Sequence, residues 1–271
     1  MNTKKNDSSI DRFVSAIEEN LSAWIPVFGT VGQIFENNPV GVRRTITGYP
    51  ISMFNSVMDT HLAPEKINTA IQCIKSDAKE HKLPVLWWVV PSTQPPDLGK
   101  RLQEYDFSIE DDDPGMAVEL ENLNEMLPKP ENFLIRAAKA NKAWKQWSII
   151  LYSTYGIPSP GEMKIEGWRR MLQEATPKMV QAYTGFLDNK PVATSLILLS
   201  ANAAGIYCVG TIPEARRKGI GAWMTLYPLL QARSLGYKIG VLFASEMGLG
   251  VYRSLGFHEY CKITSYCWPP E

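Results

Sequence analysis

The sequence has no excess of either charge, because 28 Lys and Arg residues are balanced by 28 Asp and Glu residues. Proteins that wrap nucleic acid normally carry a basic excess, so a nucleic-acid partner is not expected. The balance still permits a local anion site. The sequence also lacks the uncharged apolar run of about 18 residues that a membrane span would need. Its polar N-terminal segment has no signal-peptide core. We therefore expect a cytoplasmic protein without a membrane partner.

Cysteine and histidine are scarce. None of the four cysteines belongs to a CxxC pair, the spacing that is typical of structural zinc sites. The three histidines are scattered along the chain. The sequence therefore predicts reduced thiols and no metal cofactor.

The 271 residues fall into two halves on either side of the proline-containing segment LPKPEN, at 127–132, which is typical of a linker. We expect a flexible tail over residues 1–10, one domain over 11–128 and a second over 129–271. The segments VLWWVVPSTQPPDLGKRLQEYDF and IGVLFASEMGLGVYRSLGF each predict a strand, a loop, a short helix and an aromatic stop. Phe107 and Phe257, the two stops, lie 150 residues apart. The sequence thus predicts two tandem copies of one fold.

The most informative segment lies between a β-rich run that ends near Thr211 and an amphipathic helix expected over residues 221–235. The intervening turn is basic and rich in glycine: Arg216, Arg217, Lys218, Gly219, Ile220, Gly221. A helix start leaves about four backbone N–H groups unpaired and carries about half a positive charge. Glycine lets the backbone approach an anion closely. The turn therefore predicts a site for a diphosphate, and the alternative is a plain basic turn at a helix start.

Two other phosphate-binding loops fit this segment less well. The GxGxxG fingerprint of dinucleotide-binding proteins is absent. A P-loop needs Gly-Lys followed by Ser or Thr, whereas Lys218 precedes Gly219 here.

The order Arg216-x-x-Gly219-x-Gly221-Ala222, after a strand and a proline, resembles the Q/R-x-x-G-x-G/A pattern of the GNAT acetyltransferase superfamily. The downstream segment ASEMGLGVYRSLGF is similar to that superfamily's next block. The resemblance covers about the C-terminal half of the chain. It implies an α/β fold with a mixed, V-shaped sheet and flanking helices, in which acetyl-CoA lies between splayed central strands.

The resemblance also implies roles for individual residues. Backbone amides of the turn, together with Ala222, would bind the CoA diphosphate. Ser245 would lie near the pantetheine, and its alternative is an ordinary helix cap. Tyr252 would donate a proton to the departing thiolate, and its alternative is a core aromatic residue. A strand end would pair its backbone with the pantetheine, and its residues are Val209, Gly210, Thr211 and Ile212.

Acetyl transfer to an amine needs the amine in its neutral form, and an alkyl ammonium has a pKa near ~10.4. A general base, or a water chain that leads to one, is therefore expected. The stretch between Ala193 and Thr211 contains no glutamate, where GNAT relatives often keep one, and Glu246 is the carboxylate nearest to the loop. This favours a water relay or an acceptor that loses its own proton.

Two further features concern the acceptor and the first half. The expected helices after the linker are aromatic, and these residues could line an acceptor pocket or form the core: Trp144, Trp147, Tyr152, Tyr155, Trp168. The first half lacks the basic turn, and Leu102 stands opposite Tyr252 in the repeat. We expect the first half to be a degenerate copy that binds no cofactor.

The sequence therefore predicts an N-acetyltransferase that transfers an acetyl group from acetyl-CoA to the amine of an unidentified acceptor. A protein N-terminus or a hydroxyl is a further possible acceptor. The alternative is a non-catalytic sensor or interaction module that binds acyl-CoA. The sequence leaves the acceptor and the oligomeric state open.

Overall fold

The chain divides into two compact units in a computed structural model that describes residues 3–36, 41–157, 160–175, 179–200 and 202–268. The larger unit comprises Met1–Leu21 and Gly115–Tyr260, and the smaller unit comprises Ser22–Pro114 and Cys261–Glu271. This division differs from the expected boundary at 128/129. No helix of the described residues is long and apolar enough to span a membrane.

The larger unit is built on a mixed sheet in the order β5-β10-β9-β8-β7-β6. The strands pair antiparallel, except that β9 and β10 run parallel. Between β7 and β8, Asp188 and Asn189 have φ angles of 49° and 61°, which confirms the hairpin turn expected at this pair. The strands are β5 (Ser108–Glu119), β6 (Phe133–Ala137), β7 (Val180–Leu187), β8 (Lys190–Leu199), β9 (Ala204–Thr211) and β10 (Ile239–Phe243).

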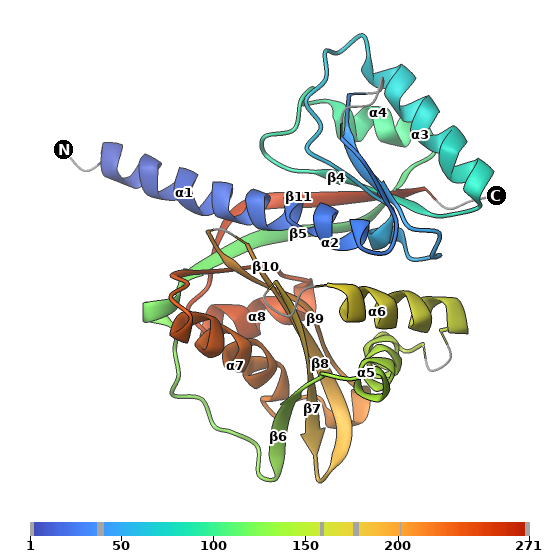
Figure 1. Cartoon of the computed structure of the whole chain (residues 1–271). Coiled ribbons are helices and arrows are strands. Elements are labelled where there is room, and N and C mark those ends of the chain that lie inside the picture. The colour runs from blue at the N-terminus through green and yellow to red at the C-terminus, as the bar shows by residue number, and fades with distance from the viewer. Residues whose placement is uncertain (1–2, 37–40, 158–159, 176–178, 201, 269–271) are drawn as a thin grey trace. The chain divides into compact units, whose positions relative to one another are not determined.

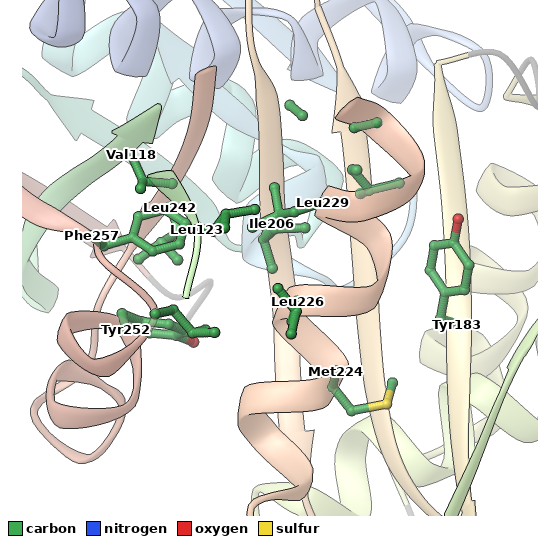
Figure 2. Packing of buried hydrophobic residues seen from close by; sticks show 14 of the residues in the cluster. Val118, Leu123, Tyr183, Ile206, Met224, Leu226, Leu229, Leu242, Tyr252 and Phe257 are labelled. Atoms are coloured by element: carbon green, nitrogen blue, oxygen red, sulfur yellow. The ribbon is translucent and has the colours of Figure 1, made fainter. Parts of the chain in front are cut away.

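Helices cover both faces of this sheet. Figure 1 shows α7 (Ile220–Ser234) and α8 (Glu246–Ser254) on one face, and α5 (Asn141–Thr154) and α6 (Glu162–Glu174) on the other. Between the sheet and α7 lies an apolar cluster that includes the fully buried Met224, Leu226 and Leu229. Figure 2 shows Leu226 and Leu229 beside Ile206 of β9, with Met224 further along α7. The cluster fixes the position of α7, and therefore of the turn that precedes it.

The N-terminal helix α1 (Thr3–Ser22) belongs to the larger unit up to Leu21. Residues 3–10, which were expected as part of a tail, are helical. Near the end of α1, the buried Asn20 donates from its side-chain nitrogen to the carbonyl oxygens of Leu198 and Ala203, both at 3.1 Å. Its side-chain oxygen accepts a hydrogen bond from the Tyr207 hydroxyl at 2.8 Å. One amide thus ties α1 to the hairpin between β8 and β9.

The strands of the smaller unit follow the order β1-β2-β3-β4-β11-β5 and belong to the same 11-stranded sheet. Here β3 and β4 run parallel, as β9 and β10 do in the larger unit. The fully buried Trp87 and Ile71 belong to its apolar core. Its remaining elements are α2 (Trp24–Gly29), β1 (Gln33–Phe35), β2 (Arg43–Ile46), β3 (Ser56–Met58), α3 (Ile67–His81), β4 (Val85–Val89), α4 (Leu98–Glu104) and β11 (His258–Trp268).

The repeat seen in the sequence is also a repeat of structure. The segments β4-α4-β5 and β10-α8-β11 have the same order, and β5 and β11 begin 150 residues apart. The amide of Phe107 donates to the carbonyl of Leu102 at 3.1 Å, and the amide of Phe257 donates to that of Tyr252 at 3.1 Å. A residue with positive φ precedes each phenylalanine. Both helices therefore end in the same backbone cap.

The unit boundaries at 114/115 and 260/261 fall inside β5 and β11. Gly115–Glu119 of β5 pair with β10, whereas Thr264–Trp268 of β11 pair with β4. The last strand of each sequence half therefore completes the sheet of the other half. The linker-based boundary could not include this exchange, because strand pairing over such separations leaves no local sequence signal.

Replacement of Asn20 by alanine is expected to lower the free energy of unfolding by about 2–4 kcal/mol, because several buried polar groups lose their partner together. Chemical denaturation followed by circular dichroism measures this effect. The matched control is Asn202→Ala, because the Asn202 amide donates to the exposed carboxylate of Glu19. The control should change stability by less than about 0.5 kcal/mol. Equal effects of the two substitutions would contradict the role assigned to Asn20.

Candidate functional site

The central strands β9 and β10 separate soon after they begin to pair. Parallel pairing covers Ala204–Ile206 of β9 and Gly240–Leu242 of β10. Two residues beyond Ile206, Cys208 has a φ of 53°, and the register with β8 shifts there. In the described part of the chain, no strand pairs with Val209–Thr211 on the side of β10. The bulge therefore turns the end of β9 away from β10 and leaves one of its backbone edges open.

The four strand-end residues predicted to contact pantetheine differ in which of their backbone groups are already paired. Gly210 and Thr211 pair with β8 on their other edge. The Ile212 amide already donates to the carbonyl of Val192 at 2.9 Å, so it is not available to a ligand. Val209 lies at the bulge and is partly exposed. The open edge is therefore confined to Val209, Gly210 and Thr211.

The turn after β9 presents unpaired backbone amides. A short 3₁₀ helix, Pro213–Ala215, leads into Arg217 and Gly219, whose φ angles are 60° and 75°. The helix α7 begins at Ile220, close to the expected start. Within the part of the chain that the structure describes, the amides from Arg217 to Ala222 donate no backbone hydrogen bond. The turn is exposed on Arg217–Gly219, so these donors lie beside solvent.

Gly221 marks open space at the start of α7. A Cβ atom added to Gly221 would meet no atom within 4 Å, and its φ is not positive. The fold therefore does not require glycine at this position. Glycine in a helix is less stable than alanine by up to about 1 kcal/mol. A ligand that approaches the backbone here would explain a glycine that the fold does not need. The residues present thus fit the phosphate groups of CoA.

Arg216 differs from the other basic residues of the turn. Its Nε donates to the carbonyl of Thr211 at 3.0 Å, and its Nη2 donates to that of Thr154 at 2.8 Å. Arg216 therefore braces the turn against β9 and α5. Arg217 and Lys218 are exposed and form no ion pair among the described residues. Their positive charge is available to an anion.

Solved structures show the same architecture. A GCN5-related N-acetyltransferase from Kribbella flavida is 18% identical with a TM-score of 0.69, over 93% of this chain and 95% of that chain. The chain has the GNAT acetyltransferase fold. A protein of unknown function from Staphylococcus epidermidis is 13% identical with a TM-score of 0.65, over 89% of this chain and 95% of that one. A tandem GNAT protein from the clavulanic acid pathway is 13% identical with a TM-score of 0.56, over 84% and 78%.

These likenesses are structural. No family model and no curated protein sequence matches the chain. The expected α/β class and the resemblance to GNAT proteins are confirmed at the level of the fold.

Tyr252 lies in α8, and Ser245 directly precedes this helix. Ser245 occupies the N-cap position, where its carbonyl accepts hydrogen bonds from Gly248 and Leu249. Its exposed hydroxyl makes no capping hydrogen bond, so the side chain is not used as a cap. Tyr252 is 8% exposed, and its ring lies 6.2 Å from that of Phe257 (Figure 2). The ring is therefore part of the core, and the role of its hydroxyl stays a prediction.

The aromatic residues of α5 and α6 divide between core and surface. Trp147 is fully buried and donates to the carbonyl of Ser195 at 3.2 Å. Trp168 packs edge-on against it at 5.3 Å. Burial raises the pKa of Tyr152 to about 12, so its phenol is neutral at physiological pH. Tyr155 is 66% exposed. The core interpretation holds for the two tryptophans, and Tyr155 is a surface residue.

One contact of the site had no signal in the sequence. Thr154, at the end of α5, lies so close to β9 that a Cβ atom on Gly210 would stand 2.2 Å from its Oγ1. A side chain at position 210 would collide with Thr154, so the packing of α5 against β9 requires glycine there. The same Thr154 supplies the carbonyl that accepts from Arg216. The end of α5, the bulge of β9 and the turn thus form one connected structure.

Replacement of Arg216 by alanine is expected to lower the free energy of unfolding by about 1 kcal/mol, because the carbonyl groups of Thr211 and Thr154 lose their donor. The neighbouring Arg217→Ala should change it by less than about 0.5 kcal/mol, because no partner is lost. Denaturation curves of the two variants measure this contrast. If Arg217→Ala were the more harmful change, the bracing role of Arg216 would be wrong.

Proposed function

We propose that the chain is an acetyl-CoA-dependent N-acetyltransferase that acts on the amine of a substrate still to be identified. The observation that carries the proposal is the row of amides from Arg217 to Ala222, which donate no backbone hydrogen bond among the described residues and are exposed over Arg217–Gly219. A helix start of this kind binds phosphate through its N–H groups and its dipole. Arg217 and Lys218 would add about 1.5–3 kcal/mol for each charged hydrogen bond that they form.

The remainder of CoA would follow the open edge of β9. On that edge, Val209, Gly210 and Thr211 have no strand partner among the described residues, although the Thr211 carbonyl already accepts a hydrogen bond from Arg216. They could pair with the amide groups of pantetheine. The unengaged Ser245 hydroxyl supplies a further polar group at the start of α8.

The chemical step requires a proton for the departing thiolate. A thiol has a pKa near ~8.5 and a tyrosine near ~10, so proton transfer from tyrosine costs only about 2 kcal/mol. We assign this role to Tyr252. The amine attacks the thioester carbon in its neutral form, and its proton leaves through water, because β9 carries no carboxylate.

The smaller unit would be a degenerate copy that binds no acetyl-CoA. Directly after β3, Asp59 has a φ of 52° two residues beyond the pairing of Val57 with Trp87. In β9, Cys208 likewise has a positive φ two residues beyond the last parallel pair, Ile206 with Leu242. In the smaller unit, however, the chain pairs again beyond this point. The Leu62 amide donates to the Gln94 carbonyl at 3.0 Å, and the Gln94 amide donates to that of Thr60 at 2.9 Å. These bonds occupy the edge that stays open in β9.

Calorimetric titration with CoA is expected to show one site per chain, and CoA should raise the melting temperature. Arg217→Glu should abolish this shift, because it places a negative charge beside the diphosphate.

Gly221→Ala should weaken CoA binding at least tenfold, and it should stabilise the free protein by about 0.5–1 kcal/mol. The reason is that the added methyl group enters open space that the phosphates would occupy.

Gly250→Ala is the matched control for this experiment. Gly250 also lies in a helix, and a Cβ atom there would meet nothing within 4 Å. It should gain similar stability and leave CoA affinity unchanged. The absence of any melting shift at millimolar CoA would overturn the proposed function. A second site per chain would refute the degenerate role of the smaller unit.

Tyr252→Phe is expected to lower kcat by about a hundredfold and to change the Kd of CoA by less than about twofold, because only the proton donor is removed. Transfer to a panel of amines, followed by mass spectrometry of the products, supplies the acceptor for these kinetics. Unchanged turnover would remove Tyr252 from the mechanism. CoA binding without transfer to any amine or hydroxyl acceptor would instead support a non-catalytic acyl-CoA sensor.

A further inference from the structure

The proline-containing segment at 127–130 lies within the larger unit, and its contacts tie it to α7. Leu127 is partly buried against the apolar cluster between the sheet and α7. The carbonyl oxygen of Pro128 accepts a hydrogen bond from Nε1 of Trp223 at 3.0 Å. Although its composition is typical of a linker, the segment is therefore a fixed part of the surface around α7.

Pro128 also borders the residue that directly precedes α7. A Cβ atom added to Gly219 would stand 3.5 Å from the Pro128 carbonyl oxygen. Trp223 lies one helical turn further along, since its amide donates to the Gly219 carbonyl at 3.3 Å. Pro128 thus approaches the start of α7 at two points. Both points lie within or directly beside the row of amides from Arg217 to Ala222.

Lys129 follows Pro128 and carries a charge that no acidic residue compensates. Its Nζ lies 5.7 Å from the centre of the Trp223 ring. The side chain is exposed and forms no ion pair among the described residues. The ring attracts the ammonium but does not neutralise it. Lys129 therefore places a third positive charge at the start of α7, in addition to those of Arg217 and Lys218.

The prolines on both sides of Lys129 restrict its backbone. Each proline has a fixed φ, and Pro130 also restricts the residue before it to extended conformations. The Pro130 carbonyl accepts a hydrogen bond from the amide of Phe133 at 3.3 Å, where β6 begins. A ligand that binds Lys129 would thus have little backbone to order, which lowers the cost of binding.

The position of Lys129 fits a phosphate other than the diphosphate. In the proposed function, on which this inference rests, the amide row, Arg217 and Lys218 bind the diphosphate. CoA carries one more phosphate, a monoester on the 3′ oxygen of its ribose. We propose that Lys129 binds this 3′-phosphate. Lys129 comes from a separate segment beside the amide row, and a lysine ammonium is a compact point charge that suits a phosphate group.

Calorimetric titrations of the full chain with CoA and with dephospho-CoA test this assignment, because the two ligands differ only in the 3′-phosphate. The titrations are made at low ionic strength, where exposed charges are screened least. CoA should bind about tenfold more tightly than dephospho-CoA, because only CoA forms the charged hydrogen bond with Lys129. Equal affinities would overturn the assignment and leave the diphosphate site intact.

Lys129→Met should raise the Kd of CoA about tenfold and change that of dephospho-CoA by less than twofold, because the lost ammonium has no partner in dephospho-CoA. Lys129→Arg keeps the charge and should keep most of the preference for CoA. Lys238→Met is the matched control. It removes an exposed lysine beyond the other end of α7, about 22 Å away along a helix of this length, and should leave both affinities unchanged.

The two ligands also separate this inference from the proposed function. If Lys129→Met weakened both ligands equally, Lys129 would not act through the 3′-phosphate, and the assignment would be refuted while CoA binding by the parent chain still stood. If the parent chain bound neither ligand, the proposed function would fail and this inference with it.

Discussion

The backbone amides at the start of α7 are the feature on which the candidate site depends. A helix cannot satisfy its own first N–H groups, so each helix start needs a cap, water or a ligand. Here, two residues in left-handed conformation, Arg217 and Gly219, shape the turn. The guanidinium of Arg216 donates hydrogen bonds to carbonyl groups of β9 and α5 and so holds the turn in position. The donors are therefore held in place before any ligand arrives, which lowers the entropic cost of binding.

Both units have a residue with positive φ after their parallel strand pair, but the backbone edge beyond it is paired in one unit and open in the other. In each, a residue with positive φ follows two positions after the last parallel pair, namely Cys208 in β9 and Asp59 after β3. In the smaller unit, the Asp59 carboxylate is held by Arg43 and Ser22, and the chain beyond it pairs with Gln94. In the larger unit, β9 stays separate from β10. Duplication of a fold thus does not duplicate its open edge, because a few hydrogen bonds decide whether that edge is closed.

Local chemistry made the turn before α7 predictable. The order of arginine, glycine and helix was sufficient to locate the turn, and the matching caps at Phe107 and Phe257 explain why the repeat was visible in sequence. The exchange of β5 and β11 was not predictable, because strand pairing between distant segments has no local pattern. The same reason applies to Asn20, whose partners lie more than 170 residues away. The Thr154–Gly210 contact likewise depends on how α5 packs, which periodicity does not specify.

Some residues lower the stability of the fold although the fold does not need them. Such residues often mark binding sites. Gly221 weakens a helix in which alanine would fit, and Arg217 adopts a conformation that favours glycine. By contrast, Gly219 and Gly210 are explained by a positive φ and by a close contact. The unexplained costs therefore fall at the start of α7, where the proposed function places the phosphate groups of CoA.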